Sequence, residues 1–284
     1  MFPIVSKEVL APTVSKFLIK APLVAKKRKA GNFVIIRIME LGERIPLTIV
    51  DSNVADGTIT LIVQAIGKTT KLLCSMKAGD SILDVVGPLG NPTPIENHGA
   101  VACVGGGVGT AELYPIAKAL KNAGNRIYSI IGGRSKELVI LESEMKACSD
   151  QVFVTTDDGS YGHKGIVTDP LRQLLTDPRN GVKAVYAIGP LPMMRAVAKL
   201  TKEFGVHTLV SLNAIMVDGT GMCGGCRVTI DGKMKFACVD GPEFDAHQVD
   251  FDELILRNRS YLEFERESLE KFGALQSSAE EGAR

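Results

Sequence analysis

The chain has 284 residues, which is enough for two domains of ordinary size and a smaller additional unit. Its 33 lysines and arginines almost balance 32 aspartates and glutamates, so the charge gives no reason to expect a nucleic-acid partner. The longest apolar runs have the length of a strand and fall short of the roughly 20 residues that a membrane span requires. Met1 to Leu10 lacks a secretory signal pattern, and we expect a cytoplasmic protein that binds no membrane.

The first part of the chain, residues 1–98, predicts a small antiparallel β barrel. Short β-branched runs alternate there with turn signals, and helical periodicity is weak. The expected strands cover residues 32–38, 45–50, 57–65 and 81–86. The following stretch, Asn91-Pro92-Thr93-Pro94, cannot continue a strand and is interpreted as a linker.

Two segments of this barrel carry groups that suit a phosphate-bearing cofactor. Residues 43–48 place a permanently charged guanidinium, a rigid proline and a hydroxyl together, so Arg44 could neutralise a diphosphate while Thr48 donates a hydrogen bond. Residues 63–70 form a second strand-to-turn segment that could hold a phosphate. Ordinary edge-strand turns would explain either segment equally well.

Residues 99–213 have a different sequence pattern, in which apolar strand-like runs alternate with helical stretches. This alternation predicts βαβ units and a parallel sheet. The expected strands cover residues 100–104, 126–131, 151–155, 184–188 and 207–212, and the expected helices include residues 111–122 and 191–204.

A glycine-rich turn joins the first of these strands to the next helix. Its glycines would let a diphosphate approach the backbone, and the helix N-terminus would stabilise the negative charge. The spacing departs from a strict Gly-x-Gly-x-x-Gly pattern, so a turn that serves packing alone is the alternative. The residues of this turn are Gly105, Gly106, Gly107, Val108, Gly109 and Thr110.

Further nucleotide-binding candidates follow other strands of the predicted sheet. Arg134, Asp157 and Gly189 lie at strand ends, and the carboxyl ends of parallel strands line the ligand crevice of such sheets. Arg134 or Lys136 could contact a 2′-phosphate or could simply be solvated. The sequence therefore leaves the choice between NAD and NADP open.

Residues 214–284 are expected to form a small cysteine-rich unit and a helical tail. Cys223 and Cys226 have the Cys-x2-Cys spacing that lets two thiols reach one iron, and Cys238 supplies a third thiol. The plant-type spacing places the remaining ligand at Asp218, whose carboxylate can replace a thiolate on iron. A 2Fe-2S cluster is the prediction. Structural zinc is the competing metal, although no histidine lies between Cys226 and Cys238, and unligated thiols beside an ordinary loop aspartate are the alternative without metal.

Taken together, these motifs resemble the ferredoxin-reductase-like flavoproteins over almost the whole chain. Within that family the chain is similar to the electron transfer subunit of dihydroorotate dehydrogenase B. It is more similar to the small subunit of NADH-dependent reduced ferredoxin:NADP oxidoreductase, also called sulfide dehydrogenase, because the dihydroorotate branch has a cysteine where Asp218 stands. The resemblance rests on residues 44–48, Gly87-Pro88-Leu89-Gly90, and residues 105–112, 157–160, 223–226 and 238–242.

The resemblance implies an oxidoreductase subunit with an antiparallel Greek-key barrel for FAD, a parallel-sheet domain for NAD(H) or NADP(H), and a 2Fe-2S unit. It implies hydride exchange between nucleotide and FAD, then single electrons passing through the cluster to a large flavoprotein and iron-sulfur subunit of a heterodimer. Ferredoxin would be reached through that subunit, and whether the complex bifurcates electrons stays open. The FAD contacts that the resemblance implies are Arg44, Pro46, Leu47, Thr48, Gln64, Gly67, Lys68, Thr69 and Thr70.

No catalytic acid or base is expected, because hydride exchange with flavin requires none. Alternative functions remain: an electron transfer subunit of the dihydroorotate dehydrogenase B type, a ferredoxin-NADP reductase using NADP(H), a relay subunit without turnover of its own, or a zinc-stabilised nucleotide sensor.

Overall fold

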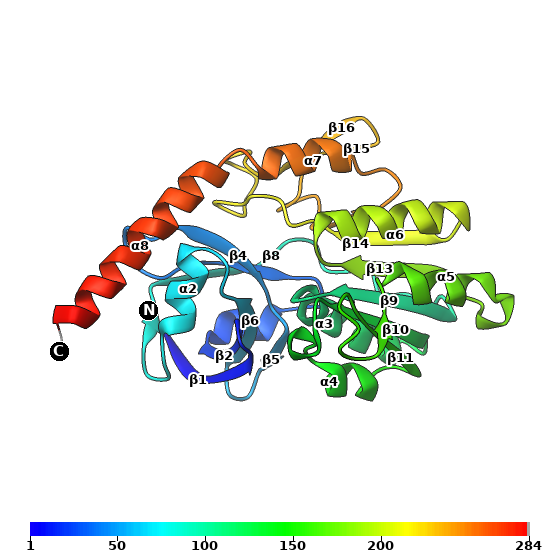
Figure 1. The fold of residues 1–284 in the computed structure, drawn as a ribbon, viewed down its shortest axis with the longest axis horizontal. Coiled ribbons are helices and arrows are strands. Elements are labelled where there is room, and N and C mark those ends of the chain that lie inside the picture. Colours follow the sequence, from blue (N-terminus) through cyan, green and yellow to red (C-terminus); the bar gives the residue numbers. More distant parts are fainter. Residues whose placement is uncertain (283–284) are drawn as a thin grey trace.

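The N-terminal part of the chain is built from short antiparallel strands in this computed structural model, which describes residues 1–282 and the side chains of residues 1–273. The strands form two sheets (Figure 1). Between them lies one apolar core that contains Phe17, Ile36 and Leu61. One sheet has the order β5 (Asp51–Asn53), β6 (Thr58–Gln64), β2 (Val14–Lys20), β1 (Phe2–Ala11), β7 (Ser81–Ile82). The other has the order β4 (Arg44–Thr48), β3 (Phe33–Arg37), β8 (Asp84–Leu89).

The barrel differs from the sequence prediction in several places, and the strand expected over residues 81–86 is divided into β7 and β8. The strands β1 and β2 were not singled out, because charged and polar residues interrupt their apolar ones. The strand β6 ends at Gln64 and a short connection follows, as expected, but helix α2 (Lys68–Ser75) then begins, and neither it nor the short helix α1 (Pro22–Lys27) was expected. Leu73 of α2 is buried in the barrel core, and this tertiary contact stabilises a helix whose first turn is polar.

The middle of the chain folds as the predicted parallel sheet with helices on both faces. In chain order its elements are β9 (Ala100–Gly106), α3 (Gly109–Asn122), β10 (Arg126–Gly133), α4 (Glu142–Ala147), β11 (Gln151–Thr156), β12 (His163–Lys164), α5 (Thr168–Thr176), β13 (Ala184–Ile188), α6 (Leu191–Glu203) and β14 (His207–Ser211). Two short 3-10 turns, η1 (Lys136–Leu138) and η2 (Pro178–Asn180), lie between them. The sheet order is β12-β11-β10-β9-β13-β14-β17, so the strand order reverses between β9 and β13.

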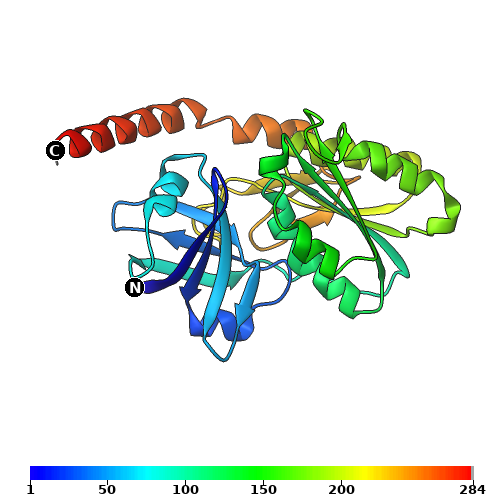
Figure 2. The same cartoon turned by 60° about the horizontal axis from the view of Figure 1, so that its bottom comes forward.

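Helices α3 and α4 cover one face of this sheet, and α5 and α6 cover the other (Figures 1 and 2). Leu113, Ile116 and Leu120 of α3 recur at the spacing of one helix face and pack on the strands. Successive residues of β9 point to opposite faces of the sheet. Val101 packs against α3 on one face, whereas Ala102 packs against α6 on the other.

The C-terminal part begins with a hairpin of β15 (Arg227–Ile230) and β16 (Lys233–Phe236), closed by Asp231 and Gly232, both at positive φ. Strand β17 (Glu243–Asp245) then pairs antiparallel with β14, so this part of the chain extends the seven-stranded sheet. Helix α7 (Phe251–Asn258) packs on the hairpin, and α8 (Leu262–Gly282) passes α2 and leaves the body of the molecule (Figure 2). Residues 283–284 of the tail lie outside the described residues.

The barrel and the parallel sheet share an apolar junction. Val14, Val50 and Ile62 of the barrel pack against Ala111 of α3 and Ile140. This contact holds the first turn of α3 against the barrel wall. Across residues 1–282, no helix has both the length and the apolar character that crossing a bilayer would require.

Candidate functional site

The glycine-rich turn lies where the strand order reverses, between the carboxyl ends of β9 and β13. A Cβ on Gly109 would lie 2.8 Å from Gly189 Cα, and a Cβ on Gly189 would lie 3.1 Å from Gly106 Cα. The loops that follow the two strands are therefore in backbone contact, which only glycine permits at these positions. The structure thus brings Gly189 to the predicted turn, although the two are far apart in sequence.

One side of this turn faces open space. Gly107 has a φ of +57°, and a Cβ built on it would meet nothing within 4 Å. Thr110 is fully buried, and no hydrogen-bond partner for its Oγ1 is found among the described residues. An open backbone, an unpartnered hydroxyl and the first turn of α3 together fit a ligand that carries negative charge and hydrogen-bonding oxygens.

Arg134 and Asp157 lie at the rim of the same crevice. The amide of Asp157 donates to Gly133 O (3.1 Å) and the amide of Asp158 donates to Arg134 O (3.2 Å), so the ends of β10 and β11 are tied together. Arg134 is exposed, whereas Lys136 lies over the Tyr161 ring with its Nζ 5.5 Å from the ring centroid. Of the two basic side chains, Lys136 is therefore already engaged within the protein.

Strand β4 presents the first barrel segment. Residues alternate along it, so Ile45 and Leu47 pack against the barrel core while Arg44, Pro46 and Thr48 share the opposite face. Arg44 is exposed and Thr48 is half-buried. One face of β4 thus combines a fixed positive charge with a hydroxyl group beside the sheet domain.

The second barrel segment forms the first turn of α2 and lies near the start of β4. Thr69 Oγ1 donates a hydrogen bond to Glu43, the residue that precedes Arg44. Thr70 Oγ1 accepts hydrogen bonds from the amides of Ile66 and Gly67, each at 3.0 Å. These contacts satisfy polar groups at the helix start, so Thr69 and Thr70 have local structural roles. Gln64 ends β6, and Lys68 opens α2 half-buried.

Glu112, the last residue of the motif 105–112, lies in the first turn of α3 and has no role assigned from the sequence. Burial raises the pKa of its carboxyl group to about 7, and the hydroxyl of Thr48 on β4 offsets part of this shift. Glu112 therefore lies where the two candidate binding segments meet. The sequence offered no signal for this pair, because its members lie in different units of the fold.

The predicted cluster ligands lie in one loop and its neighbouring turn, but they do not all converge. Cys226 and Cys238 are buried, with their Sγ atoms 3.1 Å apart. Cys223 is exposed and its Sγ accepts from the amide of Gly225 (3.4 Å). The described residues contain no group of three or more histidine, cysteine, aspartate or glutamate side chains arranged to hold a metal ion.

Asp218 is bound to the backbone of this loop. Its Oδ1 accepts from the amide of Thr220 (2.7 Å) and its Oδ2 from the amide of Cys223 (2.6 Å). These hydrogen bonds, chiefly the one from Thr220, lower the pKa of the Asp218 carboxyl. Burial raises the pKa of the Cys238 thiol, so a metal would have to displace its proton. Two adjacent buried thiols, one exposed thiol and an ionised carboxylate within residues 218–238 fit an iron-sulfur donor set.

Comparisons with known proteins agree with this geometry. The model of the iron-sulfur cluster binding domain of dihydroorotate dehydrogenase B matches residues 213–250. A dihydroorotate dehydrogenase B electron transfer subunit homolog from Thermotoga maritima is 52% identical over 269 residues, covering 95% of this chain and 94% of the relative. The electron transfer subunit from Geobacillus thermodenitrificans is 34% identical, with 87% and 96% covered. The chain belongs to this family of electron transfer subunits.

Solved structures extend the comparison to the whole fold. A chain of NADH-dependent reduced ferredoxin-NADP oxidoreductase matches with a TM-score of 0.90 and 51% identity, covering 96% of this chain and 98% of that chain. A ferredoxin NADP+ reductase from Neisseria gonorrhoeae, solved with FAD and NADP, matches with a TM-score of 0.60 at 19% identity and shows the fold alone. The resemblance and the fold class predicted from the motifs are confirmed.

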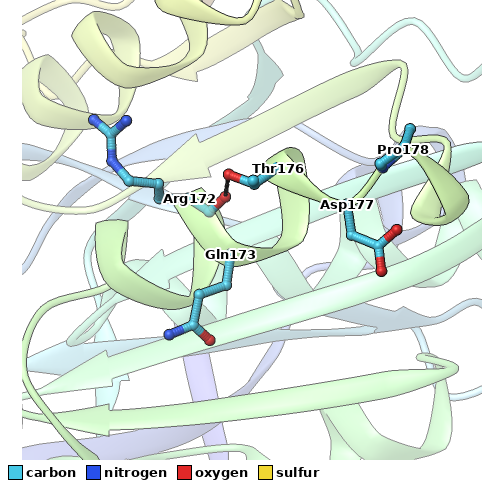
Figure 3. A pocket seen from close by; sticks show the side chains of 5 residues that line it. All are labelled: Arg172, Gln173, Thr176, Asp177 and Pro178. Atoms are coloured by element: carbon cyan, nitrogen blue, oxygen red, sulfur yellow. Dashed lines mark hydrogen bonds between the residues drawn. The ribbon is translucent and has the colours of Figure 1, made fainter.

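A separate hollow lies away from the residues described above. Figure 3 shows its lining, formed by the end of α5 and the residues that precede β13: Arg172, Gln173, Thr176, Asp177 and Pro178. These residues lie at the amino end of β13, whereas the glycine-rich turn meets the carboxyl end. The hollow is therefore no part of this family's candidate electron-transfer site.

Proposed function

We propose that this protein is the flavin and iron-sulfur electron transfer subunit of an oxidoreductase, exchanging hydride with NAD(H) through FAD and passing single electrons through a 2Fe-2S cluster. The observation that carries the proposal is one chain that joins three features. These are the charged face of β4, the glycine-rich turn at the strand-order reversal, and a cysteine loop whose Cys226 shares one apolar core with the sheet. Similarity over almost the whole chain to the NADH-dependent oxidoreductase supports it.

The division of residues among the cofactors is part of the proposal. FAD would be held by Arg44, Pro46, Leu47 and Thr48 of β4 with Gln64, Gly67, Lys68, Thr69 and Thr70, on a barrel of residues 1–98. The nucleotide would be held by residues 105–110 with Arg134, Asp157 and Gly189, on a domain of residues 99–213. The cluster would be held by Asp218, Cys223, Cys226 and Cys238, in a unit of residues 214–284.

Each group has a physical task in this arrangement. Arg44 offers a fixed charge for a diphosphate, and the backbone of residues 105–110 offers amides to a second one. Flavin supplies the conversion between a two-electron hydride donor and a one-electron acceptor, so the protein needs only to bind, orient and exclude water. Cys226 and Cys238 belong to the apolar core of the sheet, and this core would determine where the cluster lies.

The partner we propose is a larger flavoprotein and iron-sulfur subunit in a cytoplasmic heterodimer, with ferredoxin reached through that subunit. Electron transfer subunits by their name serve a second protein, and two relatives bear that name. Cys74, Cys103 and Cys148 are free, as expected in a reducing compartment. The runner-up is an electron transfer subunit of a dihydroorotate dehydrogenase B enzyme, favoured by the family match of residues 213–250.

Reduction of a one-electron dye by NADH tests the proposal directly. The full chain, purified anaerobically with its cofactors, should reduce the dye without any partner. The Arg44→Ala variant should lose FAD and activity together, because the diphosphate loses its countercharge. Exposed Arg266, on α8, gives the matched control variant Arg266→Ala, which should keep both. A chain that contains FAD and cluster yet shows no NADH-dependent reduction would contradict the proposal and favour a relay subunit.

A further inference from the structure

Strand β3 has two faces that belong to different parts of the molecule. Val34 and Ile36 are buried in the barrel core, whereas Ile35 points the other way and belongs to the apolar core that contains the buried cysteines. In the antiparallel pair of β3 and β4, Ile35 lies opposite Pro46. Residues that are directly opposite share a face of the sheet. The outer face of β3 therefore continues the face of β4 to which the proposed function assigns FAD.

The loop that begins at Asp218 lies directly against this outer face. A Cβ on Gly219 would lie 2.6 Å from Leu89 Cδ1 and 2.8 Å from Ile35 Cγ1, so the loop backbone itself touches both side chains. Gly219 also has a φ of +74°, which favours glycine. A candidate cluster ligand, Asp218, is thus next in sequence to a residue that contacts the strand beside the FAD face.

The chain that follows the last cysteine is held to the same part of the barrel. A Cβ on Gly90 would lie 2.8 Å from Phe33 Cε1 and 2.9 Å from Pro242 Cδ, so these three residues are closely packed. The Asn91 side chain donates a hydrogen bond to Val239 O (3.0 Å). The cysteine-bearing segment is therefore attached to the barrel on both sides, and its distance from β3 is set by packing.

The proposed function, on which this inference rests, requires electrons to pass from the barrel to the cysteine loop. Neighbouring strands lie about 5 Å apart, so at Ile35 the width of one strand separates β4 from the loop. We propose that Ile35 and Gly219 are positioning residues whose contact sets the separation between flavin and cluster, and with it the rate at which electrons cross β3.

The electrons are those of the proposed function. Two of them reach the flavin as one hydride from NADH, and they leave it one at a time for the cluster. Two one-electron acceptors then take them, while the proton goes to water. The rate of electron transfer falls exponentially with distance, so a wider gap between the loop and β3 slows this step and leaves hydride transfer to the flavin unchanged.

The Gly219→Ala variant widens this gap, because its Cβ has no room beside Ile35 Cγ1. When the holoprotein is mixed with NADH, the flavin should bleach at the wild-type rate. Reduction of the cluster, followed by freeze-quench electron paramagnetic resonance, should be severalfold slower. Iron per chain and the midpoint potential of the cluster are measured on the same samples, so the rate is compared per cluster and at a known driving force.

Two further variants separate positioning from a general loss of structure. Gly232 has a φ of +69° in the hairpin of the same unit, with nothing within 4 Å of an added Cβ, so Gly232→Ala carries the same backbone strain without the contact. It should keep the wild-type rate. The double variant Ile35→Ala/Gly219→Ala makes room for the added methyl group and should recover part of the rate, whereas a purely structural defect would become worse.

The placement of the loop can be read without turnover. In methyl NMR of isoleucine-labelled protein, the reduced, paramagnetic cluster should broaden the Ile35 signal more than that of Ile36, which faces the barrel core. Gly219→Ala should weaken the broadening of Ile35. Equal broadening of both signals in the wild type, or equally fast cluster reduction in Gly219→Ala and the wild type, would overturn the positioning role. A wild-type flavin that NADH does not bleach would instead contradict the proposed function.

Discussion

The glycine-rich turn and the cysteine loop are both expected to bind a cofactor, but they are held in very different ways. Around Gly109 and Gly189, backbone lies against backbone, and a single added Cβ has no room. Around Cys223, the loop is held by hydrogen bonds to Asp218, and only Cys226 and Cys238 lie together. The shape of the first site is set by backbone packing. In the second site, two of the four predicted ligands are in contact and the other two lie nearby in sequence.

This difference has a physical cause. Apolar packing and backbone contact fix the glycine-rich turn whether or not a ligand is bound, since the sheet brings β9 and β13 together. A metal centre draws its ligands together itself, and part of the folding free energy of such a unit comes from metal binding. A substitution in the glycine-rich turn should therefore prevent nucleotide binding through steric clash. A substitution in the cysteine loop should prevent cluster binding by removing a ligand.

The largest expected effect is loss of the cluster. Cys226→Ala removes one of the two thiols that lie together, so iron should fall from about two per chain to near zero while flavin stays. Iron analysis and the visible spectrum measure both. Cys148→Ala, at a buried thiol outside the loop, should keep full iron and is the control. Full iron in Cys226→Ala would refute its role as a ligand.

The next effect concerns the glycine-rich turn. The Gly109→Val variant forces backbone apart, because its Cβ would lie 2.8 Å from Gly189 Cα. It should lower the free energy of unfolding by about 1–3 kcal/mol and abolish bleaching of the flavin by NADH. Gly205→Ala, at a φ of +63° with open space around it, should cost about 1 kcal/mol and keep the bleaching. Normal bleaching in Gly109→Val would show that the turn binds no nucleotide.

A smaller effect is expected where the ligand type changes. Asp218→Cys should retain the cluster, because a thiolate can replace the carboxylate, and should shift its midpoint potential by tens of millivolts or more, on the order of changes that ligands produce. A redox titration followed by electron paramagnetic resonance measures the shift. Asn91→Ala, which removes a hydrogen bond to Val239 O beside the same unit, is the control. An unchanged titration in Asp218→Cys would count against ligation by Asp218.

The smallest effect concerns a hydrogen bond between the linker that follows the barrel and strand β17, which follows the cysteine loop. Glu243 of β17 accepts from Thr93 Oγ1 of the linker (2.6 Å), and burial raises the pKa of its carboxyl from 4.5 to about 7. The folded state therefore binds this proton more tightly than the unfolded state does. The contribution of the protonated Glu243 carboxyl to the free energy of unfolding is fully present below about pH 4.5 and is lost as the pH rises through about 7.

Glu243→Gln should remove about 1–3 kcal/mol of this dependence of the unfolding free energy on pH. Denaturant unfolding on both sides of neutrality measures it, with Glu263→Gln as the control. Parallel curves for wild type and Glu243→Gln would mean that the carboxyl does not titrate as stated.

The sequence predicted five strands of the seven-stranded sheet well, because these strands are apolar runs that end in glycine or in polar residues. Gly105 and Gly189 mark two such ends, and each of the five was placed within two residues, whereas the short strands β12 and β17 were not predicted. The barrel was predicted less completely, since β1 and β2 mix lysine and glutamate with apolar residues. Helix α2 was not predicted because its first turn is polar. The burial of Leu73, which stabilises this helix, depends on tertiary structure.

The candidate site shows the same limit. Motif spacing found Cys223, Cys226 and the glycine-rich turn, because those ligands lie close together in sequence. It could not find the pair of Thr48 and Glu112, which exists only because the barrel packs on α3. It also could not predict that β17 joins the sheet after the cysteine loop.

A visible absorption spectrum of the anaerobically purified chain, with iron, zinc and flavin measured on the same sample, tests the central claim most directly. The account predicts about one flavin and two irons per chain, with absorption that bleaches when NADH is added. A colourless protein that contains zinc would contradict it.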